Sequence, residues 1–120
     1  MTWEGKVDLQ QIIDNLHLKV LTSNLDFSAI KVDSGYTSDL LSCVMTGAKS
    51  KAIWVTLMAH GNIVAVASLL DLSAIIITEN AQPDANTISK ANEEGIAVLS
   101  SPQPSFHIIG QLWDLGLRGT

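Results

Sequence analysis

The sequence predicts a three-layer α/β/α sandwich built on a mostly parallel sheet of about five strands. Three observations support this class. The stretch 52–78 holds two apolar β-rich runs with an alanine-rich helical run between them. Strand-like and helix-like patterns alternate along most of the chain, as in sheets covered by helices. The two central strand runs are apolar on both faces, which is typical of strands with helices on each side.

The central stretch has the pattern of a strand, a helix with Asn62 as N-cap, and a second strand. Such a crossover joins parallel strands by a right-handed connection. Its length and low charge would also suit a membrane span. The Gly61–Asn62 break, the neighbouring His60 and the lack of flanking lysines and arginines argue against insertion. We therefore expect no membrane partner.

Before the central stretch, periodic apolar residues predict a helix over 7–16 and short strands over 18–22 and 29–33. The next helix is expected to begin after Thr37 or Ser38 as N-cap and to end at Gly47. The first two strands are joined too tightly for a helical crossover. At least one antiparallel pairing, and hence a mixed sheet, is therefore compatible with the pattern.

After the central stretch, Pro83 suits the first position of a helix that ends at Gly95. A strand over 97–100 and a proline-containing turn follow. The last helix ends before Gly116, and its expected apolar face consists of Phe106, Ile109 and Trp113. With 120 residues and no linker-like segment, the chain is expected to form a single domain, 1–120.

Composition excludes several classes of function. The net charge is −5, with 16% charged and 47% apolar residues, so a nucleic-acid partner is not expected. Few charges leave apolar surface to be covered, which predicts a homo-oligomer, most simply a homodimer. One cysteine, Cys43, allows neither an internal disulfide nor a multi-cysteine metal site, and no metal or cofactor is expected. Glu4 and Asp8 interrupt any signal-like apolar run, which favours the cytoplasm.

Ligands of open α/β sheets collect beyond the carboxyl ends of the strands, where loops lead into helix N-termini. The segment 34–39 (SGYTSD) offers a glycine, hydroxyls and a tyrosine that would suit a small anion, or it is an ordinary capped turn. His60 could bind a ligand or act as an acid or base, or it could support a loop. These junctions are expected to converge, with Gly35 and His60 on one rim. The segment 47–50 lacks the spacing of a phosphate-binding loop, so a P-loop kinase is excluded within this chain.

The strings GYTSDLLS (35–42), HGNIVAVASL (60–69) and GIAVLS (95–100) resemble the DRTGG-domain family, which is related to the N-terminal domain of HPr kinase/phosphorylase. The resemblance covers roughly residues 7–117. It implies a three-layer α/β module that supports oligomerisation or nucleotide-linked regulation beside other domains. The chain has no literal DRTGG string. The resemblance implies six candidate ligand-binding positions in this sequence, without assigning a chemical role to any of them: Gly35, Tyr36, Ser38, Asp39, His60 and Asn62.

Three functions are compatible with these observations. The leading hypothesis is a non-catalytic regulatory or binding module that senses a nucleotide or small anionic metabolite and forms a homodimer. The second is a small enzyme with His60 as general acid or base and Ser38 or Asp39 nearby. The third is a structural subunit of a larger complex. The sequence contains no complete catalytic motif, which favours the first hypothesis over an enzyme.

Overall fold

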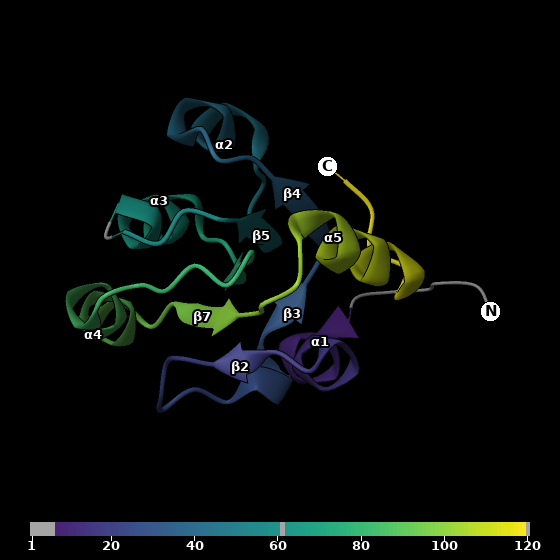
Figure 1. Ribbon diagram of the computed structural model, residues 1–120, viewed down its shortest axis with the longest axis horizontal. Helices are drawn as coiled ribbons and strands as arrows, with labels where there is room; N and C mark the ends of the chain where they lie inside the picture. Colours follow the sequence, from purple (N-terminus) through teal and green to yellow (C-terminus); the bar gives the residue numbers. More distant parts are fainter. Residues whose placement is uncertain (1–6, 61, 120) are drawn as a thin grey trace.

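A five-stranded sheet lies between two layers of helices in the computed structural model, which describes residues 7–60 and 62–119 (Figure 1). The spatial order is β2 (Lys19–Val20), β7 (Ala97–Ser100), β6 (Ala74–Ile77), β5 (Ala52–Thr56) and β4 (Ser34–Thr37). Strands β4 to β7 are parallel, and β2 pairs antiparallel with β7. The predicted three-layer class and its mostly parallel, mixed sheet are confirmed.

The two helical layers cover opposite faces of the sheet (Figure 1). Helices α1 (Leu9–Leu16) and α5 (Ser105–Asp114) pack on one face, and α2 (Leu41–Gly47), α3 (Asn62–Leu70) and α4 (Ala85–Glu94) pack on the other. Along β5, Ile53 and Val55 face α1 and α5, whereas Trp54 faces α2 and α3. Successive strand residues point to opposite faces, so an apolar strand supplies both cores at once.

The chain before the first crossover differs from the prediction. A 3₁₀ turn, η1 (Phe27–Ala29), and a short strand, β3 (Lys31–Val32), stand where one strand over 29–33 was expected. Strand β3 pairs antiparallel with β1 (Val7–Asp8), outside the main sheet. The strand beside β5 at one edge of the main sheet is instead β4, in a segment predicted to be a loop. Its turn-like residues are held extended by four parallel pairs with β5, from Ser34 with Ala52 to Thr37 with Val55.

Several helix ends also lie elsewhere than predicted. Helix α2 follows Leu40, which has no side-chain cap bond, because Thr37 is still part of β4. Asn62 is the first residue of α3 and not the residue before it, and Gly61 lies outside the described residues. Asp84 caps α4 by accepting a hydrogen bond from the Thr87 amide, so Pro83 precedes the helix. The predicted end at Gly95 is confirmed, and its φ of 69° is the left-handed conformation that favours glycine.

Helix α5 presents a different face to the core from the one predicted. Ile108 and Leu112 are buried against the sheet, whereas Phe106 is 86% exposed and Trp113 is 55% exposed. Ile109 packs partly against the core. Both sets of residues have helical spacing, and the sequence pattern by itself does not distinguish them. The prediction that Phe106 and Trp113 belong to the packed face is therefore wrong.

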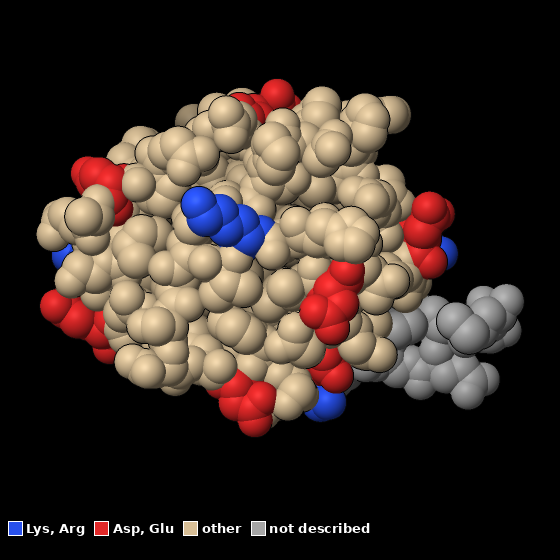
Figure 2. Space-filling view, turned by 60° about the horizontal axis from the view of Figure 1, so that its bottom comes forward, with Lys and Arg blue, Asp and Glu red and all other residues tan. Residues whose placement is uncertain are grey.

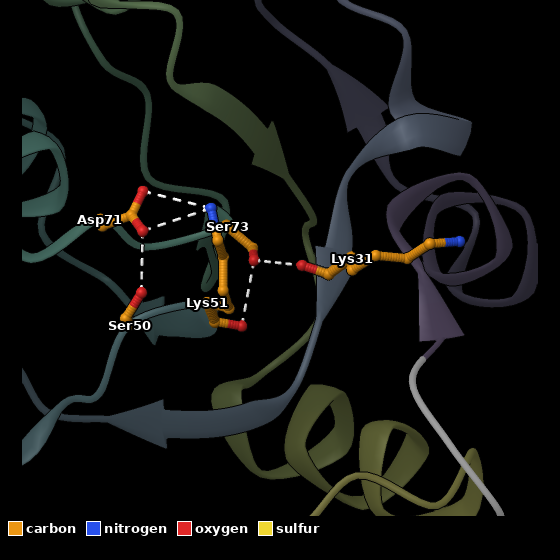
Figure 3. A network of polar contacts seen from close by, with 5 residues as sticks. All are labelled: Lys31, Ser50, Lys51, Asp71 and Ser73. Carbon is orange, nitrogen blue, oxygen red and sulfur yellow. Dashed lines mark hydrogen bonds and ion pairs between the residues drawn. The ribbon is translucent and has the colours of Figure 1, made fainter.

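Polar contacts join strand and helix ends at the amino edge of the sheet (Figure 3). The Asp71 carboxylate accepts a hydrogen bond from the Ser50 hydroxyl at 2.8 Å and pairs with the Lys51 ammonium at 3.2 Å. The Ser73 hydroxyl bridges the carbonyl oxygens of Lys31 at 2.5 Å and Lys51 at 3.0 Å. The ammonium group of Lys31 points away from this network in Figure 3. The network therefore connects β3, β5 and the α3–β6 turn without using the Lys31 charge.

Within the part of the chain that the structure describes, no helix combines the length and the apolar character that crossing a bilayer requires. The apolar stretch 52–78 is instead divided into β5, α3 and β6. Its strands are buried because helices cover both faces of the sheet.

Candidate functional site

A cavity of about 180 Å³ lies between the edge strand β4, helix α5 and the C-terminal segment 117–119. Its walls are mainly apolar and include Val55, Ile109, Leu112 and Leu117. Gly35 and Thr37 belong to the cavity side of β4, since their in-register neighbours on β5 face α5. The cavity is partly open to solvent and combines apolar walls with Arg118, which is the composition of a small-molecule site.

The C-terminal segment closes one side of this cavity. The Gly35 amide donates a hydrogen bond to the Arg118 carbonyl at 2.9 Å, which holds the segment against the outer edge of β4. The Leu117 side chain is buried, and its amide donates to the Leu112 carbonyl at 3.2 Å. Glycine at position 35 keeps the floor of the cavity free of a side chain. A Cβ atom there would come no nearer than 4.0 Å to Ile53, so the space is open.

Arg118 is the only arginine in the chain, and its side chain is fixed at the cavity rim. Its guanidinium carbon lies 3.7 Å from the centroid of the Trp113 ring, within range for a cation–π contact. One guanidinium nitrogen, Nη1, donates to the carbonyls of Trp113 at 3.0 Å and Leu117 at 2.9 Å. The other nitrogens form no hydrogen bond with the described residues, so they remain available to an anionic group.

Tyr36 connects β4 to the opposite helical layer. Its hydroxyl donates to the Cys43 carbonyl at 2.9 Å, and its ring packs with the core beside α2 and α3. A Cβ atom on Gly47 would lie 2.5 Å from the Tyr36 hydroxyl oxygen, so glycine is needed where the ring crosses α2. Tyr36 thus lines the cavity through its place in β4 while its side chain supports the other face.

Ser38 and Asp39 follow β4 at the carboxyl edge of the sheet, where they hold the loop in place. The Asp39 carboxylate accepts hydrogen bonds from the Thr56 hydroxyl at 2.8 Å and the Leu57 amide at 2.9 Å. The Ser38 carbonyl accepts a hydrogen bond from the indole nitrogen of the fully buried Trp54 at 3.0 Å. These contacts join the end of β4 to the end of β5. Binding of a ligand by Ser38 or Asp39 stays a prediction.

His60 and Asn62 lie at the start of α3, and both are exposed. The His60 carbonyl accepts a hydrogen bond from the Ile63 amide at 3.1 Å. Among the described residues, no carboxylate or hydroxyl forms a hydrogen bond with the His60 imidazole, and His60 does not line the cavity beside β4. The His60 imidazole is thus not hydrogen-bonded to Ser38 or Asp39, the two residues expected near it in an enzyme.

The six predicted residues form two groups and not one rim. Gly35 is in register with Ile53, whereas β5 continues to Thr56 before the loop that leads to His60. Three residues of strand span about 10 Å, so Gly35 lies well short of the carboxyl edge. The prediction that Gly35 and His60 share one border is wrong because 34–37 forms a strand. Their role in ligand binding stays a prediction.

Sequence reasoning missed Trp113, Leu117 and Arg118 as residues of the site. The available signal was the sole arginine, which lies five residues after a tryptophan. Only the fold shows that this segment returns to the edge of β4. Sequence reasoning also missed Glu79, whose carboxylate accepts a hydrogen bond from the Ser105 amide at 2.9 Å and so caps α5.

The structure shows no metal-binding arrangement at these positions or elsewhere within residues 7–60 and 62–119. No three histidine, cysteine, aspartate or glutamate side chains of those ranges gather closely enough to hold an ion. Charges are also sparse on the face shown in Figure 2, where acidic and basic side chains are scattered and do not form a stripe. A site in this chain therefore depends on apolar walls, backbone groups and single side chains.

No model of a known protein family matches the sequence, and no curated protein matches it either. Among solved structures, the fold is similar to the CBS and DRTGG domains of the regulatory region of Clostridium perfringens pyrophosphatase, complexed with its activator, diadenosine tetraphosphate. The TM-score is 0.73 at 19% identity, over 88% of this chain and 46% of that chain. This chain thus spans less than half the length of that chain. The likeness supports a DRTGG-like α/β fold for this protein.

Proposed function

We propose that this protein is a non-catalytic regulatory module that binds a nucleotide or a related small anionic metabolite and acts as a homodimer. The observation that carries this proposal is the apolar cavity beside β4 with Arg118 fixed at its rim. The structurally similar regulatory region was solved with a nucleotide activator, which is consistent with this class of ligand.

The size of the cavity limits which part of a ligand it takes. Pockets for drug-sized ligands measure roughly 300–1,000 Å³, so a cavity of about 180 Å³ suits one ring system. A purine base would occupy the apolar space between Val55 and Leu112. Its sugar and phosphates would extend outward, where the unpaired guanidinium nitrogens of Arg118 would pair with a phosphate oxygen.

A second part of the proposal concerns Asn62 and His60 at the start of α3. Amide groups at a helix N-terminus attract anions, and both side chains are exposed there. We propose His60, Asn62 and Ser38 as contacts for a distal phosphate of an extended ligand. Asp39, whose carboxylate would repel a phosphate, is proposed as an acceptor for a ligand hydroxyl group. Gly35 and Tyr36 belong to the cavity itself.

A non-catalytic role is consistent with the hydrogen bonds of the polar side chains at the carboxyl edge. Asp39 and Ser38 are engaged with β5, and His60 has no hydrogen-bonding side chain beside it within the described ranges. We also infer a cytoplasmic location, since Cys43 is an exposed free thiol.

Isothermal titration calorimetry with ATP, ADP, diadenosine tetraphosphate, adenosine and inorganic phosphate tests the proposal. We expect the nucleotides to bind more tightly than adenosine or phosphate alone. Arg118→Ala should weaken nucleotide binding about tenfold, which is the loss of one charge-assisted contact of about 1.4 kcal/mol. Lys90→Ala removes a positive charge from exposed α4 and is the matched control, with no expected change.

Gly35→Ala provides an independent test of the cavity. The added methyl group has space beside Ile53, so the fold should be retained while the floor of the cavity rises. We expect weaker binding with an unchanged melting temperature. If no nucleotide binds at millimolar concentration, or if neither variant alters binding, the ligand-binding part of the proposal is wrong.

A further inference from the structure

Helix α5 carries an exposed aromatic face that the described chain covers only in part, through the Arg118 guanidinium over the Trp113 ring. Phe106 is 86% exposed and Trp113 is 55% exposed. Gly110 lies between them on the same side of the helix. A shallow groove follows this face and is lined by Phe106, His107, Gly110, Gln111, Trp113 and Asp114.

Within the described residues, neither packing nor backbone conformation requires a glycine at position 110. Glycine in the middle of a helix is less stable than alanine. A Cβ atom at Gly110 would meet no atom within 4 Å, so packing within the described chain does not require its absence. Its backbone is also not in the left-handed conformation that favours glycine. A glycine at such a position allows close approach of another backbone from outside the molecule.

We propose that α5 of a second copy of this chain packs antiparallel against α5 across a twofold axis near Gly110. The face contains both a hollow and the aromatic side chains that can fill one, so two copies complement each other. In such a pair, Phe106 and His107 lie opposite the end of the helix that carries Trp113 and Asp114 of the partner subunit.

Complementary polar side chains support a second copy over an unrelated partner. The groove carries a histidine near one end and an aspartate near the other, and an antiparallel pair brings His107 toward Asp114 of the partner subunit twice. A twofold interface thus matches complementary groups on both sides. This inference rests on the homodimer in the proposed function and assigns the surface that forms it. It does not depend on the nucleotide.

The contact is expected to be modest in strength. A helix of ten residues is about 15 Å long, which limits the area that two such helices can bury. We therefore expect a reversible dimer with a dissociation constant in the micromolar range, about 1–100 μM, typical of small interfaces. Measurements must cover concentrations on both sides of that range.

Sedimentation velocity of the whole chain from about 1 to 500 μM, spanning the expected range, is the test. Gly110→Gln places a long, helix-compatible side chain at the axis and should weaken dimerisation at least tenfold. The same change should leave the melting temperature equal or higher, because glutamine favours a helix over glycine. Ser89→Gln on the exposed face of α4 is the matched control and should leave the dimer unchanged.

Phe106→Ala provides a second variant that does not touch the backbone. Its side chain is 86% exposed, so the fold should be unaffected while the dimer weakens. If the wild-type protein stays monomeric at the highest concentration, both the proposed homodimer and this interface are wrong. If the wild type dimerises and Gly110→Gln and Phe106→Ala dimerise equally well, only the assignment to α5 is wrong.

Discussion

The carboxyl edge of the sheet and the cavity beside β4 are built from different chemistry. At the edge, hydrogen bonds hold the loops to one another, as when Asp39 binds Thr56 and Leu57 or Glu79 caps α5. At the cavity, apolar side chains form the walls and the backbone of the last residues closes one side. At the edge, the polar side chains hold the loops in place. In the cavity, open volume remains, and some guanidinium nitrogens of Arg118 form no hydrogen bond with the described residues.

Ligands of parallel sheets usually bind at the carboxyl edge, but the side chains present at that edge decide whether the rule applies to a given protein. Loops at the carboxyl edge contain neither lysine nor arginine in the segments 38–40, 57–60, 78–84 and 101–104. Two of their carboxylates, Asp39 and Glu79, repel an anion while stabilising the loops. The sole arginine lies beside the edge strand instead. We therefore propose that an anionic ligand binds where the arginine and the open volume coincide.

The largest expected effect on stability comes from the cavity wall. Leu112→Ala removes a side chain that is 4% exposed and packs in the core beneath α5. The free energy of unfolding should fall by about 3 kcal/mol, because a buried leucine loses its contacts and leaves a void. Urea denaturation measures this loss. The exposed Leu69 on α3 is the control, and Leu69→Ala should cost little. Equal losses in the two variants would show that the wall is not part of the core.

The next effect is expected at the carboxyl edge. Asp39→Ala leaves the buried Thr56 hydroxyl and the Leu57 amide without their acceptor. The free energy of unfolding should fall by about 2 kcal/mol, the cost of losing hydrogen bonds to a charged group. Asp39→Asn retains an acceptor oxygen and should recover at least half of the loss. If Asp39→Ala is as stable as the wild type but no longer binds nucleotide, the distinction between a structural edge and a binding cavity does not hold.

Tyr36 tests the link between the two regions. Tyr36→Phe removes the hydroxyl that donates to the Cys43 carbonyl and keeps the ring over Gly47. Stability should fall by about 1 kcal/mol, the net contribution of one hydrogen bond. Nucleotide affinity should change less than twofold, because the hydroxyl bonds to α2 and not to the cavity wall. A tenfold loss of affinity would place the Tyr36 hydroxyl at the ligand.

The smallest effect is expected at the amino edge and depends on pH. Hydrogen bonds from Ser50 and Lys51, together with the Lys51 charge, lower the pKa of Asp71 in the folded protein. The carboxylate therefore stabilises the fold above the unfolded pKa of about 3.9, and this contribution is lost as pH falls through the lowered folded pKa. The group is exposed, so the contribution is about 0.3 kcal/mol after solvent screening.

Asp71→Asn should remove this pH dependence. Asparagine tolerates the left-handed backbone at this position, where φ is 57°, so the variant adds no strain. Melting temperatures between pH 3 and pH 7 should differ from wild type only slightly, with the difference largest at the upper end. A difference that grows toward low pH would contradict the sign of the pKa shift.

Local sequence patterns were sufficient to predict those helices and strands that a single local feature specifies. The spacing of Leu9, Ile12, Ile13 and Leu16 predicts α1, and all four are buried. Gly95 ends α4 as predicted because a left-handed C-cap favours glycine wherever it occurs. The doubly apolar runs of β5 and β6 predict strands with helices on both faces. In each case the relevant forces act within a few residues, so the sequence contains the answer.

The sequence by itself determined the α/β class, the central crossover and the end of α4. The tertiary structure decided which turn-like segment becomes the edge strand β4, which face of α5 is buried and where Arg118 lies. Each of these depends on partners distant in the chain: Gly35 pairs with Ile53 and binds the Arg118 carbonyl. The free energy that selects among alternative local conformations comes from such contacts, and local propensity is too weak to oppose it.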